Sequence, residues 1–198
     1  MRKVKVTRRT KETSVEVEFN LDGKGRYKVA SGIGFLDHML CLFSKHGLFD
    51  LDLKAKGDLE VDLHHTNEDV GITLGQALAK ALKSKAGISR FGTAVSILDE
   101  AQVRAVVDIS GRPYLDIAGP KAVISAKSQT QGYSLSYCKQ FLRAFVTASA
   151  ISLHIDILKG QDTHHILECC FKAFGRALDQ ATAIDKRKKG LPTTKGKL

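Results

Sequence analysis

The sequence contains no apolar run long enough to cross a membrane, which excludes a membrane-spanning helix. Residues 1–6 contain no apolar core, so we expect no secretory signal. The four cysteines form no C-x-x-C pair, which argues against a structural zinc knot. We therefore expect small, buried cysteines in a reducing compartment and a cytoplasmic protein.

The signatures of several common enzyme classes are also missing. The sequence has no H-E-x-x-H motif of metalloproteases, no G-x-S-x-G elbow, no P-loop and no glycine fingerprint for dinucleotides. With 198 residues, of which 43% are hydrophobic, the chain is nevertheless long and apolar enough for a globular core. A different pattern must therefore carry the function.

The formal net charge of +10 is partly concentrated near the C-terminus. The basic residues there are Lys186, Arg187, Lys188, Lys189, Lys195 and Lys197. They are compatible with nucleic-acid binding, with a solvated tail, or with a tail that binds phosphate. No aromatic residues alternate with this basic run, which weakens the nucleic-acid interpretation.

Two histidine doublets are the most informative pattern that is present. Residues 64–68 read His-His-Thr-Asn-Glu and residues 164–168 read His-His-Ile-Leu-Glu, one hundred positions later. Four of the seven histidines lie in these doublets. The same offset aligns residues 75–78 with 175–178, and a slightly different one aligns residues 51–57 with 154–160. We interpret this self-similarity as a tandem duplication.

The hydrophobic periodicity supports two similar halves. Strands are expected at 13–19, 26–30, 48–56, 95–109 (interrupted by Asp99-Glu100), 114–118 and 151–158, and helices at 35–46, 70–84, 134–149 and 164–184. Residues 62–69 are expected to form a polar loop, and 119–132 a loop with some strand. The expected fold is α+β, a duplicated strands-helix-strand-helix unit with mixed sheets and helices on one face. Halves 1–92 and 93–198, the second with the basic tail, would form one compact globular unit.

The spacing within each doublet predicts metal binding. Neighbouring residues on a helix diverge by about 100°, so His64 and His65 cannot easily ligate one ion. Glu68 lies three or four residues away and can share a face with either histidine. We therefore expect each doublet to serve two ions, in mixed sites that draw on both halves or on neighbouring subunits. Imidazole and carboxylate donors favour zinc, manganese, iron, cobalt or nickel over calcium and magnesium.

The three remaining histidines have weaker signals. His38 follows Asp37 on the first expected helix and is a plausible further ligand, with Asp37 orienting its ring. His46 ends that helix, where an interaction with the helix C-terminus is the simplest interpretation. His154 falls in a strand and is expected to be a buried, hydrogen-bonded ring.

Several longer motifs occur in order along the chain. They are residues 9–13 (Arg-Thr-Lys-Glu-Thr), 32–40 (Gly-Ile-Gly-Phe-Leu-Asp-His-Met-Leu), 64–69, 90–92, 99–101, 110–113 (Ser-Gly-Arg-Pro), 164–168 and 192–196 (Pro-Thr-Thr-Lys-Gly). With these motifs the sequence resembles the imidazoleglycerol-phosphate dehydratase family over essentially its whole length. Such a long ordered set is far more specific than a single glycine motif.

The resemblance implies a duplicated α+β fold, a shell of 24 subunits and two manganese ions per site at subunit interfaces. It implies dehydration of D-erythro-imidazole glycerol phosphate to imidazole acetol phosphate in histidine biosynthesis, with neither nucleic acid nor membrane as a partner. The implied metal ligands are His38, His64, His65, Glu68, His164, His165 and Glu168, all but His38 also counted as catalytic. Glu12 would be an acid or base beside the glycerol chain. Arg90, Arg112, Thr193 and Lys195 would hold the phosphate, with Lys172 a weaker substrate-binding candidate.

The sequence departs from the family pattern at a few positions. Leu42 stands where a glutamine is usual, and Ile97-Leu98 stand where the family often has Pro-Met. Gln140 stands where some members supply a further histidine ligand, which would weaken or open one coordination position. Two alternatives remain open at this stage, a di-metal hydrolase of a phosphorylated nitrogenous compound and a basic RNA- or ribosome-associated protein.

Overall fold

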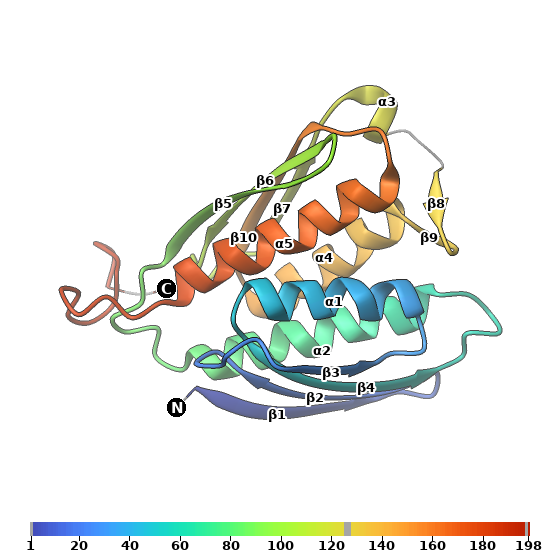
Figure 1. The fold of residues 1–198 in the computed structure, drawn as a ribbon. Helices are drawn as coiled ribbons and strands as arrows, with labels where there is room; N and C mark the ends of the chain where they lie inside the picture. The colour runs from blue at the N-terminus through green and yellow to red at the C-terminus, as the bar shows by residue number, and fades with distance from the viewer. Residues whose placement is uncertain (1, 125–127, 197) are drawn as a thin grey trace.

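The computed structural model describes residues 2–124, 128–196 and 198, and it contains two four-stranded sheets with helices between them (Figure 1). The first sheet consists of β1 (Lys3–Arg9), β2 (Thr13–Asn20), β3 (Tyr27–Ala30) and β4 (Asp50–Gly57). Its order is β1-β2-β4-β3, antiparallel except for the parallel pair of β3 and β4. The parallel pair requires a crossover, which helix α1 (Gly34–His46) provides. Helix α2 (His64–Leu82) follows β4.

The second half repeats this arrangement. Its sheet consists of β5 (Phe91–Leu98), β6 (Ala101–Asp108), β7 (Tyr114–Ala118) and β10 (Ser152–Lys159), in the order β5-β6-β10-β7. Helix α4 (Leu135–Ser149) takes the place of α1, and α5 (Thr163–Thr182) takes the place of α2. Among the described strands of this second sheet, β7 and β10 form the one parallel pair. The predicted duplicated α+β fold with mixed sheets is confirmed. The predicted division between residues 92 and 93 stays a prediction, and β5 begins just before it.

Burial corrects the strand alignment between the two halves by one residue. Leu51 and Leu53 of β4 are buried, and Leu153 and Ile155 of β10 are buried in the same way. His154, which the sequence alignment paired with Leu51, is exposed instead of buried as predicted. Its ring stacks on Tyr114 with centroids 5.5 Å apart. A shift of one residue moves every side chain of a strand to the other face, which explains both errors.

The core is formed where the helices of one half pack on those of the other (Figure 1). Helix α2 lies along α4, and α1 lies along α5. Phe43, Phe145 and Phe174 meet at the centre, with the Phe43 ring 5.2 Å from Phe174 and the Phe145 ring 5.3 Å from Phe174. As predicted, Cys138, Cys169 and Cys170 are small buried residues of this core, whereas Cys41 is only half-buried.

Three local predictions were wrong or incomplete. Strand β1 was not expected from the sequence, and most of its side chains are exposed or half-buried. Helix α2 begins at His64, so residues 64–69 are helical and not the predicted loop. Residues 119–132, predicted as a loop with some strand, contain the unpredicted helix α3 (Lys121–Ile124) and the short strand β8 (Gln129–Thr130), which pairs with β9 (Tyr133–Ser134); residues 125–127 lie outside the described residues. Among the described residues, no helix is both long and apolar enough to span a membrane.

Candidate active site

The predicted metal ligands lie near the beginnings of helices that start at the same end of the molecule. Helices α1, α2, α4 and α5 run in the same direction, each beginning at the right of Figure 1. The contacts agree, because Asn67 near the start of α2 donates to the Tyr137 carbonyl near the start of α4 at 2.9 Å. The parallel packing therefore gathers both doublets and His38 at one end.

His38, His164 and Glu168 form a compact group of donors. The Oε1 atom of Glu168 lies 3.1 Å from Nε2 of His38 and 3.0 Å from Nε2 of His164. One ligand atom from each residue falls within 4.8 Å of the others. His164 and Glu168 are one helical turn apart on α5, and His38 reaches them from α1. The geometry is suitable for a single metal ion.

Lys172 completes this group on the next turn of α5. Its Nζ donates to Oε2 of Glu168 at 2.5 Å, so both carboxylate oxygens have partners. Burial alone would raise the pKa of Glu168, but the hydrogen bonds from Lys172, His38 and His164 outweigh burial and lower the pKa to about 2. The Glu168 carboxylate is therefore ionised at neutral pH, as metal ligation requires.

The second histidine of each doublet is oriented by a carboxylate. Nδ1 of His65 lies 2.9 Å from Oδ2 of Asp58, and Nδ1 of His165 lies 2.7 Å from Oε2 of Glu100. These hydrogen bonds raise the pKa of both histidines. The Glu100 pKa is lowered to about 2, chiefly by His165. Holding Nδ1 in this way leaves Nε2 as the ligand atom, a common arrangement for metal-binding histidines.

Glu12 lies at the matching position in the first half. It occupies the β1–β2 turn, as Glu100 occupies the β5–β6 turn, and its Oε2 is 3.9 Å from Nδ1 of His65. Its side chain is 55% exposed and contributes to a hollow of about 370 Å³ beside Asp58. Glu12 is thus accessible to a small molecule near the first doublet.

The start of each doublet helix is held by an aspartate. Asp162 accepts hydrogen bonds from the backbone N–H groups of His164 and His165, and Asp62 accepts one from that of His64 at 2.6 Å. These carboxylates satisfy donors that a helix start would leave unpaired. Asp58, Glu100 and Asp162 were all missed as site residues. The Glu100 position could have been found by aligning the two hairpin turns of the repeat.

The first doublet does not form an equivalent cluster within this chain. Among the described histidine, cysteine, aspartate and glutamate residues, His38, His164 and Glu168 are the one set of three or more whose ligand atoms lie close enough to share an ion. His64 and Glu68 lie on the first turns of α2, and Glu68 is exposed. The structure therefore brings three of the seven predicted ligands together. The other four lie outside this cluster: His64, His65 and Glu68 on α2, and His165 on α5.

The predicted phosphate-binding residues lie at the opposite end of the second sheet. Arg90 directly precedes β5, pairs with Asp108 at 2.7 Å, and donates to the Pro192 carbonyl at 2.9 Å. Thr193 and Lys195 follow in the same tail, and the C-terminal Leu198 returns to Gly111, beside the exposed Arg112. Strand β5 has eight residues, so this end lies about 25 Å from the β5–β6 turn, where Glu100 contacts His165 of α5.

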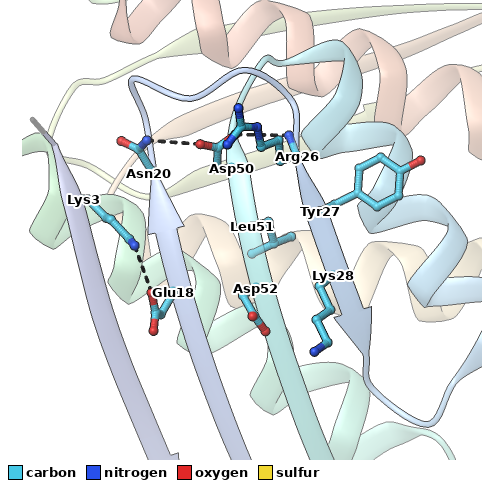
Figure 2. A pocket seen from close by; sticks show the side chains of 9 residues that line it. All are labelled: Lys3, Glu18, Asn20, Arg26, Tyr27, Lys28, Asp50, Leu51 and Asp52. Carbon is cyan, nitrogen blue, oxygen red and sulfur yellow. Dashed lines mark hydrogen bonds and ion pairs between the residues drawn. The ribbon is translucent and has the colours of Figure 1, made fainter.

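A hollow on the outer face of the first sheet contains none of the predicted site residues. It measures about 390 Å³ and is lined mainly by charged residues, including Lys3, Glu18 and Asp52 (Figure 2). Lys3 and Glu18 pair across its floor at 3.1 Å. Some of its charges are therefore already paired within the sheet. Its volume alone does not make it a better candidate for the active site than the histidine cluster.

The comparisons with known proteins identify the family of this chain. The family model for imidazoleglycerol-phosphate dehydratase matches residues 31–178. The chain belongs to the imidazoleglycerol-phosphate dehydratase family. Relatives bearing the family name include one from Thermoanaerobacter pseudethanolicus, 54% identical over 197 residues, covering 99% of each chain. Another, from Acetivibrio thermocellus, is 49% identical, covering 100% of this chain and 99% of that one.

Solved dehydratases of this family share the fold. The crystal structure from Staphylococcus aureus is 35% identical with a TM-score of 0.80, covering 92% of this chain and 100% of that one. The structure from Pyrococcus furiosus, a complex with (S)-C348, is 35% identical with a TM-score of 0.81, covering 97% and 99%. The resemblance noted in the sequence is confirmed. The individual roles of the site residues stay predictions.

Proposed function

We propose that this protein dehydrates D-erythro-imidazole glycerol phosphate to imidazole acetol phosphate in the histidine pathway of the cytoplasm. Family membership supports the reaction class. The observation that carries the proposal is the joining of His38, His164 and Glu168 across helices from opposite halves, because a nitrogen-rich site suits an imidazole substrate. The proposed partners are this phosphorylated imidazole and further copies of the chain.

The donor set fits two divalent cations, which we propose to be Mn²⁺. His38, His164 and Glu168 would hold one, and His64 with Glu68 would contribute to the other, with Nε2 of His65 and His165 available to either. When bound, the ions would supply Lewis-acid stabilisation of the deprotonated imidazole ring and a carbinol oxygen. The ionised Glu168 carboxylate and the fixed imidazole tautomers are the features of this chain that support metal binding.

The side chains of this protein would handle the proton transfers. The substrate loses hydroxide from the carbon beside the ring, a proton converts it to water, and the next carbon loses its proton to a base. Glu12 is accessible and lies beside His65, so its carboxylate is the proposed proton carrier. The resulting enol becomes the ketone when the ring-side carbon gains a proton and the enol hydroxyl loses one.

The distance between the two predicted groups supports an oligomer. The substrate has only a three-carbon chain between ring and phosphate, with bonds of about 1.5 Å each. It cannot reach from the histidines of one chain to Arg90 and the tail of the same chain, about 25 Å apart along β5. We propose that neighbouring subunits complete each site, in a homo-oligomer of 24 subunits.

A direct assay tests the proposal. Purified protein would be depleted of metal, reloaded with Mn²⁺ and incubated with imidazole glycerol phosphate, with product followed as an enolisable ketone. We expect ketone formation only with metal, and its loss in Glu168→Ala. Phosphate release without ketone would instead favour a di-metal hydrolase, and absence of both products would overturn the assignment.

A further inference from the structure

The internal repeat places a different side chain opposite each doublet. Helix α1 packs on α5 such that a Cβ on Gly175 would lie 2.5 Å from the Phe43 carbonyl oxygen. Helix α2 packs on α4 in the same way, with Gly75 at 2.4 Å from the Phe145 carbonyl oxygen. Phe43 therefore corresponds to Phe145. Counting five residues back in each helix pairs His38 with Gln140.

The register of α2 on α4 supports this correspondence near the doublet. Asn67 contacts the Tyr137 carbonyl, and a Cβ on Gly71 would lie 2.7 Å from the Phe141 carbonyl oxygen. Gln140 lies between these two contacts on α4, as Glu68 lies between Asn67 and Gly71 on α2. Gln140 is thus in the stretch of α4 that packs against the start of α2.

We propose that the two metal half-sites of this chain are unequal, and that Oε1 of Gln140 is a ligand in the weaker one. The stronger half-site consists of His38, His164 and Glu168, and the weaker one of Gln140, His64 and Glu68. This inference rests on the proposed metal dependence. It concerns how this chain divides affinity between its two ions.

The environment of Gln140 is the observation that carries the inference. Its Oε1 atom is shielded from solvent and accepts no hydrogen bond from the described residues. A buried acceptor without a donor is unfavourable, and a cation would relieve it. Each of the two half-sites would then have three donors. In the weaker one, the amide oxygen of Gln140 takes the place that the imidazole of His38 has in the stronger one.

A second asymmetry separates the two glutamates. Lys172 donates to Glu168 in the stronger half-site, whereas the corresponding residue on α2 is Ile72. Within the described part of the chain, Glu68 has no ion pair. Its charge is therefore available to a cation without displacing a lysine. The weaker half-site thus offers carboxylate and amide oxygens with one imidazole, a set better suited to Mn²⁺ or Mg²⁺ than to Zn²⁺.

Metal-binding measurements test the inference without relying on catalysis. Metal-free protein would be titrated with Mn²⁺ by equilibrium dialysis with metal analysis, and binding repeated with Zn²⁺. We expect two affinity classes for the natural chain. The preference for Zn²⁺ over Mn²⁺ should be smaller in the weaker class than in the stronger one. Gln140→His should tighten the weaker class by about tenfold or more, a change comparable to that from perturbing a ligand's hydrogen-bond partner.

Matched variants distinguish this effect from general ones. Gln140→Glu preserves the size of the side chain and should also tighten the weaker class, which covers the case in which Gln140→His fails to fold. His38→Gln should weaken the stronger class, and Gln76→His, on α2 beyond the site, should change neither. Sedimentation would verify assembly of each variant.

The failures of the two proposals differ. Equal affinity classes in the natural chain, or no response to either Gln140 variant, would overturn the inequality and leave the dehydratase assignment intact. Absence of any bound Mn²⁺ would overturn both. A tightened second class in Gln140→His, with an unchanged first class, would support the inference directly.

Discussion

At the scale of single residues, the site depends on carboxylates that hold histidines in one orientation. Asp58 and Glu100 come from different parts of their repeats, the first after β4 and the second in the β5–β6 turn, yet each binds Nδ1 of the second doublet histidine. The same requirement has therefore been met by different residues in the two halves. The consequence is that each partnership can be perturbed without affecting the other.

Glu100→Gln should lower the pKa of His165 toward its ordinary value, because the raised pKa comes chiefly from the Glu100 hydrogen bond. The measurement is a ¹³C NMR titration of labelled histidine in metal-free protein. Asp58→Asn is the matched control and should lower the pKa of His65 while leaving that of His165 in place. A normal His165 pKa in the unmodified protein would contradict the assignment.

The pH dependence of the Glu100–His165 pair has a definite sign. The folded His165 pKa is raised, so its contribution to stability is complete at pH values below the unfolded pKa, about 6.5. That contribution is lost as the pH rises through the raised pKa. The Glu100 pKa is lowered to about 2, so its contribution is complete above the unfolded pKa, about 4.3, and is lost as the pH falls from there through the lowered value. The pair therefore stabilises most in the mildly acidic range.

At the scale of elements, glycines set the separation of the central helices. Gly75 lets α2 approach α4, and Gly175 lets α5 approach α1, at equivalent positions of the repeat. These approaches bring His38 within reach of Glu168. The geometry of the proposed metal ligands thus depends on residues that take no part in the proposed chemistry.

Gly75→Ala and Gly175→Ala should each destabilise the protein by about 1–3 kcal/mol, because the added methyl overpacks a tight helix contact. Denaturant unfolding of metal-free protein measures the change. Gly34→Ala is the control, since a Cβ there meets nothing within 4 Å, and alanine favours helix over glycine. Equal stability of Gly75→Ala and the natural chain would show that α2 and α4 can accommodate the added methyl group, and would contradict the prediction.

At the scale of the whole molecule, the length of the second sheet separates the proposed metal-binding residues (the metal end) from the proposed phosphate-binding residues (the phosphate end). Both ends contain residues that one small substrate must contact in the proposed reaction. Each chain therefore carries one metal end and one phosphate end. Assembly would place the metal end of one copy beside the phosphate end of a neighbouring copy. Activity would then belong to the oligomer and not to an isolated subunit.

Mixing two inactive variants tests this division. Glu168→Ala impairs the metal end and Lys195→Ala impairs the phosphate end, so each alone should lose most activity. Co-assembly of the two from unfolded subunits should restore activity, because some interfaces combine the intact end of each variant. Refolding each variant alone is the control, and no gain on mixing would place both ends of a site in one chain.

Much of the fold followed from local patterns, and the exceptions have physical causes. The alternation of apolar and polar residues predicted β2, and the helical spacing of apolar residues predicted α1, α4 and α5. The start of α2 was misassigned because residues 64–69 are polar, and the helix begins there through Asp62, whose carboxylate accepts the His64 N–H. Strand β1 was missed because it is an edge strand with only Val6 fully buried.

The sequence by itself determined the duplication, the candidate metal-binding side chains and the family, since all of these depend on identity and spacing along the chain. The tertiary structure decided which residues meet. His38 reaches Glu168, 130 positions away, and Gln140 takes the matching place, only because parallel helices from opposite halves pack at glycines. It also decided that Arg90 and the tail lie far from the histidines, since sheet length separates groups that the sequence alone could only assign to one site.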